Sequence, residues 1–199
     1  MPNIYAFQGM IPVVDPSAYV HPSAILIGDV IVGPGVFVAP CAVLRGDFGR
    51  IVVEENANIQ DHCVMHGFPD RDTLVETLGH IGHHAIIHGA IVRRNSMIGM
   101  GAILLDYCEI GADCIVAAQA LVKANEVIPP RSMVAGIPAK RIRDVTDKDL
   151  DWKRLATRDY MRLPPAYHAS LKPAEPLRAA EPNRKRNYAC ESLPKHAMK

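Results

Sequence analysis

The sequence lacks the features that mark membrane, secreted and nucleic-acid-binding proteins. Its 199 residues contain no run of 18 apolar ones, and no basic segment precedes an apolar stretch near the N-terminus. These absences argue against a membrane span and a secretion signal. The 22 Lys and Arg nearly balance the 21 Asp and Glu, so the net charge of +1 gives no strong attraction to nucleic acid or membranes. We expect a cytoplasmic protein with one main core.

The sequence also lacks the usual helical and strand periods. Instead, large apolar residues recur mostly in steps of six. They are Val14, Val20, Leu26, Val32, Val38, Leu44, Val53, Ile59, Met65, Ile81, Ile87, Val92, Ile98, Leu104, Ile110, Val116, Val122, Ile128 and Val134. A short fixed period fits a solenoid, whose units bury their apolar faces by stacking. A stack of ordinary short β-strands fits less well, because hairpin turns and two-fold alternation are missing.

Disulfide signals are also missing. The sequence has five cysteines but no Cys-x-x-Cys pair. A second column, two residues before the large apolar positions, holds mostly small side chains. Cys63, Cys108 and Cys114 belong to this column. We therefore expect these three cysteines to fill the core.

The C-terminal third differs in composition from the repeat. Thr146 is a candidate N-cap for a helix over residues 147–163, which Pro164 and Pro165 are expected to stop. An apolar stripe on this helix would pack on the solenoid wall or on a neighbouring subunit; it consists of Trp152, Leu155, Ala156 and Tyr160. We expect a solenoid domain over 1–140, a helix over 141–163, and a loose tail rich in Pro, Lys and Arg over 164–199.

Polar side chains gather directly after the large apolar positions. This outward column contains Arg45, Gln60, His66, Gly82 and His88. If residues 67–79 form an inserted loop, His66 and His88 lie two turns and roughly 10 Å apart, with Gly82 leaving the space between them open. Two imidazoles can then share a metal.

His83 lies outside this column and cannot easily join the other two histidines within one chain. A neighbouring subunit's His83 would complete three nitrogen ligands, the pattern of a catalytic zinc centre with an open water position. The predicted metal ligands are thus His66, His83 and His88.

These residues resemble known families. The repeat, with the closing stretch 134–140, is similar to the hexapeptide-repeat proteins, which implies a left-handed parallel β-helix over residues 10–140. The signature of γ-class carbonic anhydrases is similar to Arg45-Gly46-Asp47, Asn58-Ile59-Gln60-Asp61, His66 and His83-x4-His88. That resemblance implies a homotrimer with Zn²⁺, or Fe²⁺ or Co²⁺, at its interfaces. It further implies that Gln60 orients the metal-bound water and that Arg45 pairs with Asp47 and Asp61 across the interface.

A narrower resemblance is to the PaaY-like proteins of phenylacetic acid degradation and the related CaiE-like proteins. It is carried by residues 45–53, 65–69 and 79–83, and extends to 145–154 and 181–186. It implies a metal-dependent thioesterase that hydrolyses acyl-CoA esters, such as ring-hydroxylated phenylacetyl-CoA, with metal-bound hydroxide. Arg93, Arg94 and Arg184–Arg186 are candidate partners for the CoA phosphates.

Three other functions remain open. The first is γ-class carbonic anhydrase activity, which we expect to be low because Phe48 stands where those enzymes have a glutamate. The second is a metal-free acyl-CoA acyltransferase that uses one histidine as general base. The third is a non-catalytic scaffold that keeps the family site. Metal content separates the second from the metal enzymes, and stopped-flow hydration of carbon dioxide tests the first.

Overall fold

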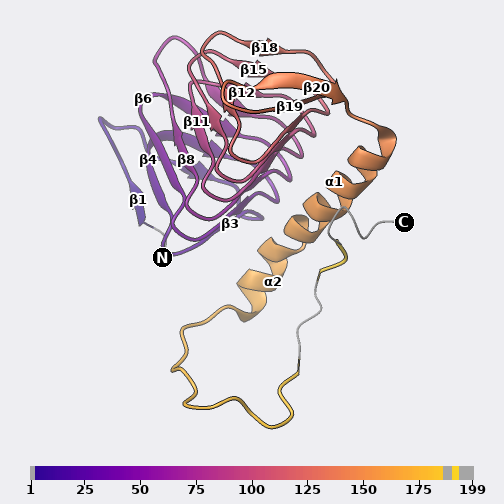
Figure 1. Cartoon of the computed structure of the whole chain (residues 1–199). Coiled ribbons are helices and arrows are strands. Elements are labelled where there is room, and N and C mark those ends of the chain that lie inside the picture. The colour runs from indigo at the N-terminus through magenta and orange to yellow at the C-terminus, as the bar shows by residue number, and fades with distance from the viewer. Residues whose placement is uncertain (1–2, 186–189, 193–199) are drawn as a thin grey trace.

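The computed structural model describes residues 3–185 and 190–192 and shows a stack of short strands with a long helix along one side (Figure 1). The strands are β1 (Asn3–Tyr5), β2 (Val13–Val14), β3 (Tyr19–Val20), β4 (Ile25–Val32), β5 (Phe37–Val38), β6 (Val43–Val53), β7 (Asn58–Ile59), β8 (Val64–His66), β9 (Thr73–Val75), β10 (His80–Ile81), β11 (Ile86–His88), β12 (Ile91–Val92), β13 (Met97–Ile98), β14 (Ile103–Leu104), β15 (Glu109–Ile110), β16 (Ile115–Val116), β17 (Leu121–Val122), β18 (Val127–Ile128), β19 (Ser132–Ala135) and β20 (Lys140–Asp144). The helices are α1 (Asp147–Met161) and α2 (Leu163–Ser170).

The strands form three faces of a parallel solenoid. The first face stacks β8, β11, β14 and β17, and the second stacks β9, β12, β15 and β18. The long strand β6 joins them, because its first half pairs with β8 and its second half with β9. The third face runs from β3 to β19, and β20 closes it as an antiparallel strand. The expected parallel β-solenoid is confirmed.

The core consists of the two predicted columns. The large aliphatic residues from Leu26 to Val134 are almost completely buried, and the small residues lie beside them. Cys63, Cys108 and Cys114 are fully buried in this core, as predicted. Burial raises the pKa of the Cys63 thiol to about 12, which keeps it protonated and unreactive.

One part of the predicted repeat was wrong. Residues 67–79 are not a loop, because they contain β9, whose Val75 is fully buried in the core. The chain therefore completes one turn between Met65 and Ile87, and β8 and β11 are directly paired, with His66 opposite His88. These histidines lie on adjacent turns, not two turns apart.

The C-terminal helical region covers the third face. Thr146 caps α1 in a reciprocal capping box with Asp149, as expected for a Thr followed three residues later by an acid. Trp152 and Ala156 pack on the solenoid wall. Pro164 and Pro165 follow the end of α1, but they also begin α2, where proline's fixed φ suits the first turn. The helical region therefore extends past the predicted end at residue 163. Among the described residues, no helix has the length and apolar character needed to cross a bilayer.

Candidate functional site

Two histidines face each other at the end of the first face. His66 follows Met65 in β8 and His88 follows Ile87 in β11, and direct pairing of these strands puts the two rings side by side. The His66 Nδ1 and His88 Nε2 atoms are 3.1 Å apart. Two nitrogens bound to one tetrahedral zinc at its usual bond length would be about 3.3 Å apart. The spacing therefore fits two ligands of one metal ion.

A carboxylate holds the other nitrogen of each ring. Asp47 Oδ1 lies 3.0 Å from His66 Nε2, and Asp106 Oδ1 contacts His88 Nδ1. A carboxylate on the far nitrogen fixes the tautomer and leaves the near nitrogen's lone pair for a metal. Burial lowers the pKa of His66, which favours the neutral form that a metal needs. On distance, tautomer and charge, the pair fits Zn²⁺, Fe²⁺ or Co²⁺.

Asp106 was missed by the sequence analysis. It follows His88 by 18 residues, the length of a regular turn of this solenoid, so the repeat carried a signal that would have placed it beside His88. Asp47 was predicted, but as an interface residue. Partial burial alone would raise the pKa of Asp47, but hydrogen bonds from Arg45 and His66 outweigh it and hold the pKa below its usual value.

His83 lies elsewhere, just after β10 at the end of the third face. Asp61 Oδ2 is 2.7 Å from His83 Nδ1, so this ring also has a carboxylate on one nitrogen and presents the other. Within the described part of one chain, no three His, Cys, Asp or Glu side chains are close enough together to hold a metal ion. The role of His83 as a third ligand given by another copy of the chain stays a prediction.

Gly82 does not separate His66 from His88, contrary to the prediction. It follows Ile81 on the third face, where a Cβ would lie 2.8 Å from the carbonyl oxygen of Ile98. Close approach of the neighbouring backbone, not space for a metal, accounts for this glycine.

Gln60 is almost completely buried beside Gly82. Its amide nitrogen contacts Asn58 Oδ1 at 3.0 Å and His80 Nε2 at 2.7 Å, and its oxygen accepts the backbone N–H of His83 at 3.2 Å. Gln60 thus fixes the position of His83, and its oxygen keeps one lone pair for a further donor. The predicted role in orienting a metal-bound water stays a prediction.

His80 is a second residue that the sequence analysis did not assign to the site. It lies under α1, where Asn58 and Thr157 flank Nδ1, and it accepts the hydrogen bond from Gln60. Burial, reinforced by the charge of Lys153, lowers the pKa of His80 to about 3. A neutral His80 can accept from Gln60 throughout the physiological pH range.

This buried histidine should make the protein sensitive to acid. The unfolded chain takes up a proton at His80 near pH 6.5, whereas the folded chain does not until about pH 3. The contribution of neutral His80 to the free energy of unfolding is therefore fully present above pH 6.5 and is lost as the pH falls toward 3. Between pH 7 and pH 5 the loss from this residue alone should be about 2 kcal/mol. Urea unfolding at one protein concentration should show a shallower acid slope for His80→Gln than for the wild type. Equal slopes would contradict a neutral His80.

Aromatic rings frame the histidine pair. Phe48 lies 5.2 Å from the His66 ring and Phe68 lies 5.3 Å from the His88 ring, measured between centroids. Tyr107 stacks behind Phe68. Phe48 is 61% exposed although it is large and apolar, so it offers an open hydrophobic surface beside His66.

The remaining predicted residues make contacts within the chain. Arg45 Nη1 is 2.7 Å from Asp47 Oδ2, whereas Asp61 contacts His83. The pairing of Arg45 with Asp61 across an interface therefore stays a prediction.

The candidate phosphate-binding arginines that the structure describes are paired with acids. Arg93 bonds to Glu76 and Glu109, and Arg184 to Glu181. Arg94 Nη2 lies 3.6 Å from Asp113. Arg186 lies outside the described residues.

Comparisons with known proteins agree with this fold. No family model matches the chain. Carnitine operon protein CaiE from Proteus sp. (strain LE138) is 52% identical over 184 residues, which are 92% of this chain and 93% of that protein. A hexapeptide transferase family protein from Anaplasma phagocytophilum has a crystal structure with a TM-score of 0.79 and 31% identity over 83% of this chain and 98% of that chain.

A proposed acetyltransferase from Bacillus cereus has a TM-score of 0.83 and 30% identity over 84% of this chain and 98% of that chain. These matches confirm the left-handed parallel β-helix. The chain belongs to the hexapeptide-repeat family that includes carnitine operon protein CaiE.

Proposed function

We propose that this protein is a metal-dependent thioesterase that hydrolyses acyl-CoA esters. The observation that carries the proposal is the His66–His88 pair, with 3.1 Å between the facing nitrogens and a carboxylate behind each ring. His83 of a neighbouring copy would supply the third nitrogen in a homotrimer. When bound there, zinc would lower the pKa of a water molecule to about 7 and so supply hydroxide at neutral pH.

The residues of the chain prepare this site. Asp47 and Asp106 keep the two imidazoles in the ligand tautomer, and Asp61 does the same for His83. Phe48 and the Phe68–Tyr107 stack cover the flanks of the pair. In an assembled site, such rings would help to exclude water and strengthen the electrostatic interactions there.

The same rings favour an organic acyl group over carbon dioxide. A carbonic anhydrase needs a route by which a proton leaves the bound water, and Phe48 cannot carry a proton. An exposed aromatic ring beside His66 suits an apolar or aromatic acyl group. The resemblance to PaaY-like proteins names a specific substrate class, ring-hydroxylated phenylacetyl-CoA esters. The similarity to a proposed acetyltransferase from Bacillus cereus supports a CoA-related function more generally.

Metal analysis with a panel of CoA thioesters tests this function. The purified protein should contain one zinc, iron or cobalt ion per chain and release free CoA from hydroxylated phenylacetyl-CoA with water as the acceptor. A metal-loaded protein that leaves aryl-CoA and alkyl-CoA thioesters intact would exclude the thioesterase.

An acyltransferase is the second candidate, because the B. cereus and A. phagocytophilum neighbours are described as transferases. In that case CoA would be released only after addition of an amine or alcohol acceptor, and activity would survive removal of the metal by a chelator. The thioesterase requires the opposite result in both assays.

A further inference from the structure

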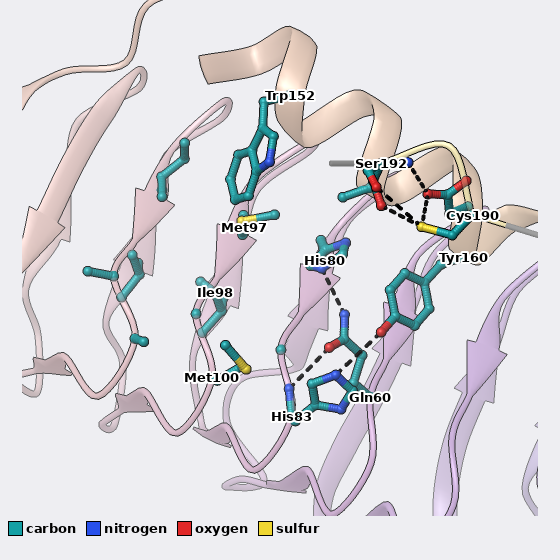
Figure 2. A pocket seen from close by; sticks show the side chains of 18 of the residues that line it. Gln60, His80, His83, Met97, Ile98, Met100, Trp152, Tyr160, Cys190 and Ser192 are labelled. Carbon is teal, nitrogen blue, oxygen red and sulfur yellow. Dashed lines mark hydrogen bonds between the residues drawn. The ribbon is translucent and has the colours of Figure 1, made fainter. Parts of the chain in front are cut away.

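An apolar groove of about 840 Å³ lies between the third face and α1 (Figure 2). Its walls carry Met97, Met100 and Met133, together with Ile115 and Trp152. Trp152 projects from α1 over Met97 (Figure 2). Methionine side chains are flexible and polarizable, so three of them beside an indole form a surface that adapts to apolar ligands. The volume is in the range of ligand pockets, about 300–1,000 Å³.

The groove changes from apolar to polar at one end. His83, Gln60 and Tyr160 line that end. Figure 2 shows Tyr160 reaching from α1 toward His83, where its hydroxyl lies 3.5 Å from Nε2. The groove therefore leads to the histidine that, in the proposed function, completes the metal site of a neighbouring copy. An apolar channel that ends at a few polar groups is the usual form of a small-molecule site.

A C-terminal segment borders the groove. Asp159 of α1 accepts the backbone N–H groups of Glu191 and Ser192 at 2.9 and 2.8 Å, and Cys190 Sγ lies 3.1 Å from its carboxylate. Arg162 also pairs with Glu191 at 2.7 Å. Partial burial works against ionisation, but these hydrogen bonds outweigh it and lower the pKa of Asp159 to about 2. The segment is thus held as a wall over a wide pH range.

We infer that this groove binds the acyl group of the thioester, and that it selects bulky apolar or aromatic acyl groups. The inference rests on the proposed function for the identity of the occupant. The thioester would lie at the His83 end, and the apolar portion would extend along the methionines toward Trp152. Trp152 is the only tryptophan in the sequence, so its fluorescence reports on the groove alone.

A titration with phenethyl-CoA tests the inference, because this thioether lacks the carbonyl and cannot be hydrolysed. The emission of Trp152 in the full-length protein should change saturably with phenethyl-CoA and not with CoA at the same concentration. Ala118, an exposed residue of the groove wall, provides the blocking variant: Ala118→Leu should weaken binding by at least about fivefold. The matched control is Ala166→Leu, an exposed position on α2 outside the groove, which should bind as the wild type does.

The outcomes separate this inference from the proposed function. If phenethyl-CoA binds and Ala118→Leu weakens it, the groove site stands even if no thioester is hydrolysed. If thioesters are hydrolysed but the Trp152 emission and the effect of Ala118→Leu are both absent, the groove site is excluded and the thioesterase is not. If the Trp152 emission changes when the protein is diluted but not when phenethyl-CoA is added, a second copy of the chain fills the groove. That result also overturns the inference. If Ala118→Leu does not fold, the wild-type titration still decides.

Discussion

Replacing His88 with alanine should lower kcat/KM for a CoA thioester by at least about a thousandfold, because the proposed metal that activates water would be lost with its ligand. One of the two facing nitrogens disappears, and Asp106 loses its partner. Elemental analysis should show a metal content well below that of the wild type. His62→Ala is the matched control, because the His62 ring is exposed and stacks on His84, at 4.8 Å between centroids. Full metal content and activity in His88→Ala would remove the proposed centre.

Mixing subunits tests the shared site more sharply. His83→Ala and His88→Ala should each be inactive alone, since each proposed homotrimer would lack one ligand at all of its interfaces. After unfolding and refolding together in equal amounts, about one quarter of the interfaces should combine an intact His83 with an intact His66–His88 pair. Recovery of about a quarter of the wild-type activity would support ligands from two copies. No recovery from mixtures shown to contain mixed trimers would mean that the site lies within one chain.

Lys153→Ala should lower the free energy of unfolding by about 3 kcal/mol at pH 10.5, where little stability is lost to holding the amine neutral in the fold, and this is the largest stability effect that we expect. Lys153 is completely buried under α1, where its Nζ donates to the carbonyl oxygen of Leu78 and, at 2.9 Å, to Asn95 Oδ1. Alanine removes three buried methylenes at about 0.8 kcal/mol each and leaves two acceptors without their donor. Urea denaturation at a fixed protein concentration measures the difference.

The pH dependence separates the charge of Lys153 from its packing. Burial lowers its pKa to about 7, whereas the unfolded chain keeps a value near 10.5. The unfolded state therefore binds more protons between these values, and stability contributed by this residue rises with pH, by roughly 1 to 2 kcal/mol between pH 7 and pH 8.5. Lys153→Met keeps the apolar stem and should lose this rise. A rise that persists in Lys153→Met would assign it to other groups, and a wild type without it would contradict the low pKa.

The solenoid could be predicted because its core repeats. Each strand of a face buries one large and one small residue, so buried residues recur at a fixed spacing that is visible in the sequence. The prediction failed only where four extra residues before β9 break the step, and the buried Val75 was missed there. That one omission put His66 and His88 two turns apart instead of on paired strands.

The site was predictable only where it follows the repeat. Asp106 was within reach, since it follows His88 by one regular turn. The setting of His80 was not, because Thr157 and Lys153 come from α1, more than 70 residues away. The angle and height at which a helix docks on a wall depend on tertiary packing, and no local period records them. The groove over Met97 and Trp152 was hidden for the same reason.

The antiparallel strand β20 affects how the end of the solenoid can pair with other molecules. A stack of parallel strands has unpaired backbone N–H and C=O groups on its terminal strands, and a strand of another molecule can pair with them. β20 turns back along β19 and occupies that position on the third face. Its sequence, Lys-Arg-Ile-Arg-Asp, is exposed at every residue, and a charged, reversed strand is a poor template for a further parallel turn. The strand thus blocks the addition of a further parallel turn on the third face.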